Sequence, residues 1–398
     1  MKSNQSEERY QTHSDIPFWR DERVLRTASQ IISAAIIIGV LAWVTINFIQ
    51  GANQRGMSLN FNFLSDPAEF PISDSVIPYD PSRTFGYAFL VGLIKTLLVA
   101  VIGIFLSTIL GTLIGLARLS SNWLVSRLAL AYIEFHRNIP LLVLLFLWYF
   151  PVFGSLPAVE ESIQLGEAVF FNERGLYLPM PRLNEGGSIW LISLIIGFIL
   201  AIIAWKVLRK RQETTGQSTY FAPISLAILI VIPLIGWFLA GRIPLRFEYP
   251  FFEGFNYHGG LRFTPEFAAL VIGLTMYTAA FIAEVVRAGV QSVDRGQIEA
   301  ARAIGLSQVR VLGLIVLPQA LRVIIPPLIS QYLNLAKNSS LAFFIGYQEV
   351  FSVGKIAINQ AGRAIPVFAM VMITYLLISL FISLILNIYN RRIQFVER

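Results

Sequence analysis

The residues with the most distinctive types and spacing lie in one polar loop between two long apolar segments. An acidic residue and two alanines are followed by a glycine and an Ile-x-Leu-Pro sequence, at Glu299, Ala300, Ala301, Gly305, Ile315, Leu317 and Pro318. Small alanine side chains leave a helix surface slim enough to seat in a groove of another protein. The chemistry indicated is therefore non-covalent docking of a partner; an ordinary amphipathic loop helix is the alternative.

Neighbouring residues predict where this helix begins and ends. Asp294 and Gln297 have the spacing of a helix N-cap box, and the charge of Glu299 is favourable near the positive end of the helix dipole. Gly305 can adopt the left-handed conformation that ends a helix. We therefore expect one short helix in the loop, followed by a second that Ser307 would cap.

Polar residues within or beside apolar segments are a second group of candidates, because polar groups at membrane depth are costly. They are Lys337, Asn338, Ser339 and Ser340 and, on another segment, Thr275, Tyr277 and Thr278. We expect the helix before Lys337 to be interrupted at Pro326 and Pro327, which would turn backbone polar groups toward a cavity. The first group could then contact a substrate's carboxylate and ammonium groups; a helix C-cap with interhelical hydrogen bonds is the alternative.

Lys95, Glu284 and Arg287 are charged residues inside apolar segments and are weighed separately. Glu284 and Arg287 are three residues apart and can pair on one helix face, and we expect this structural ion pair to anchor the polar loop. Lys95 is expected to snorkel to the membrane surface.

Signatures of catalysis and of metal binding are missing from the sequence. Cysteine is absent, the three histidines are scattered, and no G-x-x-x-x-G-K-[ST] sequence occurs. We therefore expect a chain that is not an enzyme and that binds no metal, no cofactor and no nucleic acid.

The composition indicates a membrane protein. Of the 398 residues, 55% are hydrophobic and only 14% are charged, which excludes a soluble enzyme. Continuous apolar runs favour helices over barrel strands, so we predict an all-α integral membrane protein with about eight transmembrane helices. The runs lie at 28–49, 87–117, 140–156, 188–207, 222–240, 264–287, 316–336 and 364–389.

The distribution of basic residues predicts the orientation. If the chain crosses the membrane eight times, 20 of its 31 Lys and Arg residues share a side with the N-terminus. This bias predicts that both termini are cytoplasmic. The acidic segments 50–86 and 157–187 then face the periplasm.

The motifs resemble those of a known family. The E-A-A-x3-G-x9-I-x-L-P pattern resembles the cytoplasmic EAA loop of ABC-importer permeases, and the sequence around Lys337 resembles that family's L-K-x-[ST]-S-L segment. The stretch 90–153 resembles the subset that imports polar amino acids, with Gly92-Leu93-Ile94-Lys95-Thr96-Leu97 and Arg137-Asn138-Ile139-Pro140-Leu141-Leu142-Val143. Two departures are Ile139 in place of threonine and His136 between the aromatic residue and Arg137.

The resemblance implies a type I ABC importer permease core with a two-helix insert, as in the larger permeases of general L-amino-acid systems. Glu299 and Gly305 would belong to the coupling helix that docks on a separate ATPase. The segments implied are a cytoplasmic tail (1–27), a first transmembrane helix (28–49), a periplasmic loop (50–86), the first core part (87–156), the insert (157–260), the second core part (264–391) with its EAA loop (288–318), and a cytoplasmic tail (392–398).

The partners implied are an ABC ATPase dimer that carries ATP and Mg, a second permease subunit, a periplasmic amino-acid-binding protein, membrane lipid and the amino-acid substrate. The second permease could be identical or, as the size and the insert favour, different. The implied location is the bacterial inner membrane.

Two other functions remain open at this point. An ion-coupled secondary amino-acid transporter would predict inverted repeats and acidic residues inside spans, whereas only Glu284 lies inside one, at its end. A non-transport membrane scaffold would not need the polar Lys337–Ser340 segment at depth.

Overall fold

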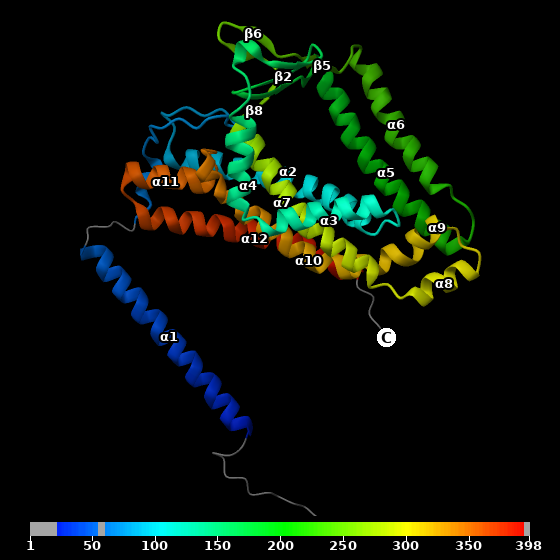
Figure 1. Ribbon diagram of the computed structural model, residues 1–398, viewed down its shortest axis with the longest axis horizontal. Helices are drawn as coiled ribbons and strands as arrows, with labels where there is room; N and C mark the ends of the chain where they lie inside the picture. The colour runs from blue at the N-terminus through cyan, green and yellow to red at the C-terminus, as the bar shows by residue number, and fades with distance from the viewer. Residues whose placement is uncertain (1–21, 55–59, 394–398) are drawn as a thin grey trace, which may run out of the picture.

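The structure, a computed structural model, describes residues 22–54 and 60–393 of the chain. Most of these residues are helical, and short strands gather at one end of the molecule (Figure 1). The predicted cytoplasmic tails fall largely on residues 1–21 and 394–398, which lie outside the described residues.

The helices are, in chain order, α1 (Glu22–Gln54), α2 (Phe85–Arg118), α3 (Trp123–Asn138), α4 (Leu141–Leu147), α5 (Gly187–Thr215), α6 (Phe221–Ala240), α7 (Pro265–Gln291), α8 (Arg295–Ala303), α9 (Gln308–Val311), α10 (Leu317–Asn338), α11 (Val350–Ala361) and α12 (Ala364–Ile393). Shorter helical segments of other pitch are η1 (Asn62–Ser65), η2 (Trp148–Phe153), η3 (Val159–Glu161), η4 (Leu312–Val316) and η5 (Ser339–Ile345).

Among the described residues, seven helical segments are long and apolar enough to cross a membrane. An eighth span is obtained if α3 and the α4–η2 segment, which are bent by 107° at their junction, form one broken span. The break lies at Ile139, which is extended because it precedes Pro140. The prediction of a helical membrane protein with about eight spans is confirmed.

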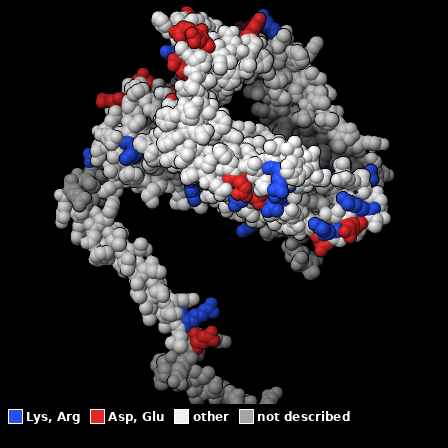
Figure 2. All heavy atoms as spheres, in the orientation of Figure 1, with Lys and Arg blue, Asp and Glu red and all other residues white. Residues whose placement is uncertain are grey.

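The first helix stands apart from the others. In Figure 1 α1 lies away from the main body, and in Figure 2 its visible face carries charge only near its first residues. None of its most apolar window is buried against the rest of the chain. A helix whose apolar surface is not buried by the described part of its own chain needs lipid or another protein around it.

The core forms where α2 packs on α7. Gly111 and Gly115 let the two backbones approach closely, because a Cβ at Gly111 would lie 2.6 Å from the Ile282 Cβ and one at Gly115 would lie 2.7 Å from the Ala283 carbonyl oxygen. Helix α10 packs against both helices of this pair, and α12 packs on α10. From the side, α3 crosses α7, and the Tyr132 hydroxyl donates to the Met276 carbonyl at 2.8 Å.

Within the described residues, eight short strands occur that the sequence analysis did not predict. Each has only three or four residues, too few to show an alternating pattern. They are β1 (Ile163–Leu165), β2 (Val169–Asn172), β3 (Gly175–Leu178), β4 (Met180–Leu183), β5 (Leu245–Glu248), β6 (Phe251–Glu253), β7 (Asn256–His258) and β8 (Leu261–Phe263).

These strands close the base of the insert. The hairpin of α5 and α6, whose helices pack mainly on each other, leaves and returns through β4 and β5, which pair antiparallel with Met180 opposite Glu248. A separate four-stranded sheet has the order β1-β2-β3-β8. Because β8 leads directly into α7, the sheet is tied to the helical core.

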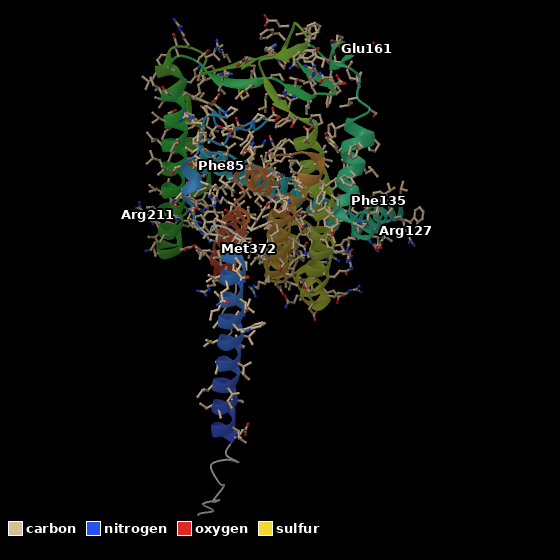
Figure 3. The ribbon with its side chains drawn as sticks, turned by 90° about the vertical axis from the view of Figure 1, so that its left-hand side faces the viewer. Phe85, Arg127, Phe135, Glu161, Arg211 and Met372 are labelled. Atoms are coloured by element: carbon tan, nitrogen blue, oxygen red, sulfur yellow. The ribbon has the colours of Figure 1, made fainter. Side chains whose placement is uncertain are left out.

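The charged residues at the two ends of the hairpin lie far apart. Figure 3 shows Glu161 at the strand end and Arg211 near the opposite end of α5, and it shows Arg127 and Phe135 projecting outward from α3. The uncharged length of α5 and α6 between their ends suits a lipid environment.

The prediction of an interrupted helix at Pro326 and Pro327 is wrong. Helix α10 runs through both prolines from Leu317 to Asn338 and changes to the 3₁₀ segment η5 only at Ser339. Prolines are tolerated inside packed membrane helices because neighbouring groups satisfy the backbone atoms that they free. Tight packing against α7 is therefore sufficient to keep α10 continuous.

Candidate functional site

The polar loop forms a compact knob built on α8. Asp294 is the N-cap residue, and its carboxylate accepts a hydrogen bond from the Gly296 backbone N–H at 2.6 Å. The Gln297 side chain is hydrogen-bonded to Gln319 at the start of α10. The N-terminal end of α8 is therefore held both by its own cap and by the following membrane helix.

The C-terminal end of α8 has the Schellman geometry. Gly305 is left-handed, with φ at +85°, and its N–H donates to the Arg302 carbonyl at 2.9 Å. The Leu306 N–H reaches back to the Ala301 carbonyl at 3.2 Å. The chain thus turns sharply at Gly305 and enters α9 after Ser307, whose hydroxyl makes no cap hydrogen bond.

Helix α8 has one anchored side and one free side. Ala301 is buried in a cluster with Val293, Val311 and Val316. Glu299 and Ala300 are exposed, and Ile304 and Val309 have 78% and 79% of their surface free. Exposed apolar side chains at the end of α8 and on α9 form a surface suited to a protein partner.

An ion pair lies on α7 above this knob. The Arg287 guanidinium contacts the Glu284 carboxylate at 2.8 Å and also donates to Gln291 at 2.6 Å. These contacts link the last turns of α7 just before the loop. Both charges remain partly exposed, so the pair stiffens this helix end more than it stabilises the fold.

The polar residues at the end of α10 do not share one surface. Lys337 is exposed, whereas Ser339 is fully buried and its hydroxyl donates to the Ala336 carbonyl at 2.8 Å. The Ser340 hydroxyl donates to the Lys337 carbonyl at 2.8 Å, and Asn338 is half-buried. Ser339 and Ser340 therefore satisfy carbonyl groups at the helix end, whereas the Lys337 side chain is exposed.

The polar residues of α7 lie in its buried middle. Thr278 is buried, and the Thr275 hydroxyl has no hydrogen-bond partner among the described residues. Tyr277 packs against the hydrophobic cluster that holds Leu335 and Ala342 from α10 and η5. Tyr277 and the residues on either side of the Lys337–Ser340 segment thus belong to one cluster.

A buried carboxylate that the sequence analysis missed connects three helices. Glu349 is fully buried, and its carboxylate accepts from the Ser352 backbone N–H at 2.9 Å, which caps α11. It also accepts from the Tyr375 hydroxyl of α12 at 2.5 Å and from Thr96 of α2 at 3.4 Å. Burial raises the pKa of this carboxyl above its usual value. The only sequence signal was an acidic residue three positions before a serine.

The prediction that Lys95 snorkels to the membrane surface is wrong. Its side chain is buried, with 2% of its surface exposed, and its ammonium donates to the Ser73 carbonyl at 2.5 Å. The segment before α2 folds over this part of the helix and supplies that carbonyl. Lys95 therefore points into the protein.

No cluster of three or more His, Asp or Glu side chains that could hold a metal ion occurs in residues 22–54 and 60–393. The arrangement described above is one of docking surfaces and buried polar contacts.

Comparison with known proteins gives a family match over most of the chain. Residues 103–395 match the family described as "Binding-protein-dependent transport system inner membrane component". The match includes α7, α8 and α10 and therefore the whole loop that carries the knob.

Individual relatives extend this match over almost the full length. The chain is 44% identical to YhdX of Escherichia coli, which carries the name of an amino-acid ABC transporter permease, over 93% of this chain and 94% of YhdX. It is 42% identical to AapQ of Rhizobium johnstonii, a general L-amino acid transport system permease, over 93% and 92%. It is 38% identical to BztB of Rhodobacter capsulatus, a glutamate/glutamine/aspartate/asparagine transport system permease, over 95% and 96%.

Proposed function

This chain belongs to the family of binding-protein-dependent transport system inner membrane components, and from that premise we propose that it is the permease subunit of an ATP-binding-cassette importer for polar L-amino acids. It would span the inner membrane and provide the path for the substrate. Binding of the substrate outside and hydrolysis of ATP inside would belong to other chains.

The observation that carries this proposal is the construction of α8. A helix capped by Asp294 and ended by Gly305 is held on one side by Ala301, so its free side is presented in a fixed position between two membrane helices. Such a knob transmits a push from a docked partner to α7 and α10. We propose that Glu299, Ala300 and the flanking Ile304 form the contact with the ATPase.

The substrate class is supported by the names of the relatives. AapQ is named for general L-amino acid transport and BztB for glutamate, glutamine, aspartate and asparagine. A zwitterion that crosses hydrocarbon loses several kcal/mol of hydration for each unpaired polar group, so a polar path is required. Lys337, Asn338 and the α7 residues Thr275 and Thr278 are the candidates for this chain's side of it.

The proposed assembly has two permease subunits and two ATPase subunits, and a periplasmic binding protein delivers the amino acid to the strand end. ATP and its Mg would be held by the ATPase pair. When that pair closes, α8 would move with it, and the core helices would rock between outward and inward states. The second permease is proposed to be a different chain.

We also propose that both termini are cytoplasmic. Figure 1 shows the last described turns of α12 on the side of the molecule where α8 lies, and away from the strands. The basic group at the end of α5 that includes Arg211 lies away from the strand end (Figure 3). Both arrangements agree with the excess of Lys and Arg residues expected on the side of the membrane that holds the N-terminus.

The test is co-purification of the tagged chain with its ATPase from membranes, combined with uptake of labelled amino acids. Glu299→Lys and Gly305→Asp are expected to abolish both, while the matched control Glu167→Lys, an exposed charge reversal in the strand region, leaves co-purification intact. Uptake that persists without any ATPase would instead indicate an ion-coupled transporter. Undiminished co-purification of both α8 variants would refute the docking role.

A further inference from the structure

The buried ammonium of Lys95 has no ionic partner in the described part of the chain. It donates to the Ser73 carbonyl at 2.5 Å and lies 4.4 Å from the centre of the Tyr347 ring, on the ring's face. No described carboxylate lies within ion-pair distance of it. A buried charge with no direct ionic contact is costly, so an anion bound beside Lys95 would lower that cost.

The three carboxylates whose charge acts on Lys95 are each engaged elsewhere. Asp74 contacts the Arg262 guanidinium at 3.7 Å, and Glu266 accepts from the Tyr149 hydroxyl at 3.1 Å. Glu349 is occupied by its own helix cap and by the Tyr375 hydroxyl. None of the three therefore forms a hydrogen bond or ion pair with the Lys95 ammonium.

Lys95 lines a polar cavity of about 410 Å³ that is large enough for such an anion. The charged groups around the cavity are Asp74, Lys95, Arg262 and Glu266, which are two cations and two carboxylates. A wall with balanced charge suits a molecule that carries both signs. It disfavours a dianion such as phosphate, which the carboxylates would repel.

An adjoining, mostly apolar pocket of about 570 Å³ shares Asp74, Arg262 and Tyr347 with this cavity and adds Leu98 and Phe267. A ligand with a charged head and a longer side chain could therefore place its head at Lys95 and its side chain along α2.

The cavity is assembled by segments that are far apart in sequence. Lys95 comes from α2, Asp74 from the segment before α2, Arg262 from β8 and Glu266 from the first turn of α7. All of them lie toward the strands and away from α8. This position is on the side from which an imported solute arrives.

We propose that this cavity is an entry site for a free L-amino acid, with the α-carboxylate bound by Lys95 and the α-ammonium bound by Asp74 and Glu266. The site rests on the proposed import function and is separate from the residues at the end of α10. At this site the chain would recognise the α-carboxylate and α-ammonium groups of the substrate before the substrate enters the path through the membrane.

The test measures binding of labelled L-glutamine to the purified full-length chain, assembled with its ATPase but without a binding protein. Competition by unlabelled L-glutamine, by its α-carboxamide and by N-acetyl-L-glutamine reports each charged contact separately. The native chain is expected to prefer L-glutamine over the α-carboxamide by about tenfold or more, because the α-carboxamide has no carboxylate to pair with the buried Lys95 ammonium. Lys95→Met is expected to lose this preference, and the control Lys355→Met is expected to keep it.

A second pair of variants keeps the test decisive if Lys95→Met does not fold. Asp74→Asn and Glu266→Gln should keep the preference for a free carboxylate but lose discrimination against the N-acetyl compound. Full discrimination in both variants, or in Lys95→Met, would overturn the proposal, as would absence of L-glutamine binding to the native assembly at millimolar concentration. ATP-dependent uptake by the same preparations distinguishes failure of the entry-site proposal from failure of the import proposal. If the variants keep both uptake and full discrimination, only the entry site is refuted. If the native assembly shows no uptake, the import function is refuted.

Discussion

The Tyr375 hydroxyl donates a hydrogen bond of 2.5 Å to the Glu349 carboxylate and so joins α12 to the first residue before α11. The same carboxylate caps α11 through the Ser352 N–H and reaches Thr96 of α2. One buried acidic side chain thus holds three helices together at the end of the molecule opposite α8. Its partners are expected to determine how stable this junction is.

Loss of the phenolic hydroxyl should weaken the junction. Tyr375→Phe leaves the buried Glu349 carboxyl with one donor fewer, and a hydrogen bond contributes about 0.5–1.5 kcal/mol, with a further cost for a buried acceptor left unsatisfied. We expect a clear fall in the thermal midpoint of the purified chain in detergent. Tyr389→Phe, an exposed tyrosine on the same helix, is the control and should not differ from the native chain. Equal midpoints for the two variants would contradict the role of this bond.

The buried carboxyl also predicts a pH dependence of stability. Burial raises the pKa of Glu349, so the folded chain holds this proton to higher pH than the unfolded chain. Its contribution to stability is complete below the unfolded pKa of about 4.3 and is lost as the pH rises through the folded pKa. The thermal midpoint of the native chain should therefore fall, relative to that of Glu349→Gln, as the pH is raised above about 4.5. A constant difference between the two chains across this range would show that the carboxyl does not titrate there.

The end of α8 should depend on backbone conformation at Gly305. Open space surrounds this glycine, so an added methyl group would meet no atom within 4 Å. The only cost of a side chain here is the backbone φ of +85°, which residues other than glycine rarely adopt. Gly305→Ala should cost about 1–2 kcal/mol, and Gly305→Asn less, because asparagine tolerates this conformation. Hydrogen exchange of the α8 amides measures the effect. Gly313→Ala, which also has open space but no positive φ, should leave α8 exchange unchanged.

The close approach of α2 and α7 should not tolerate a larger residue. A Cβ at Gly111 would lie 2.6 Å from the Ile282 Cβ and 2.8 Å from the Ala279 carbonyl oxygen. Gly111→Ala is therefore expected to separate the helices at a cost of about 1–3 kcal/mol, and Gly111→Leu to prevent folding. The yield of monodisperse protein and its thermal midpoint report this loss. Gly39→Ala on α1, where no atom lies within 4 Å, should behave as the native chain does.

Local features of this protein were predictable from the sequence. The spans follow from apolar runs as long as a bilayer is thick, and the ends of α8 follow from Asp294 and Gly305, whose caps need only residues a few positions away. The expected interruption at Pro326 failed because the rule for a proline in an isolated helix ignores the packing of α10 against α7.

The sequence by itself determined the helical membrane architecture, the capped helix in the loop after α7 and the family resemblance, because hydrophobic length and cap spacing are encoded within short stretches of chain. Only the tertiary structure decided that Lys95 points inward, that Ser73 lies over it and that Glu349 connects α2, α11 and α12. These contacts join residues separated by up to 253 positions. The burial of a charge depends on which segments fold over it, and no local pattern reports that.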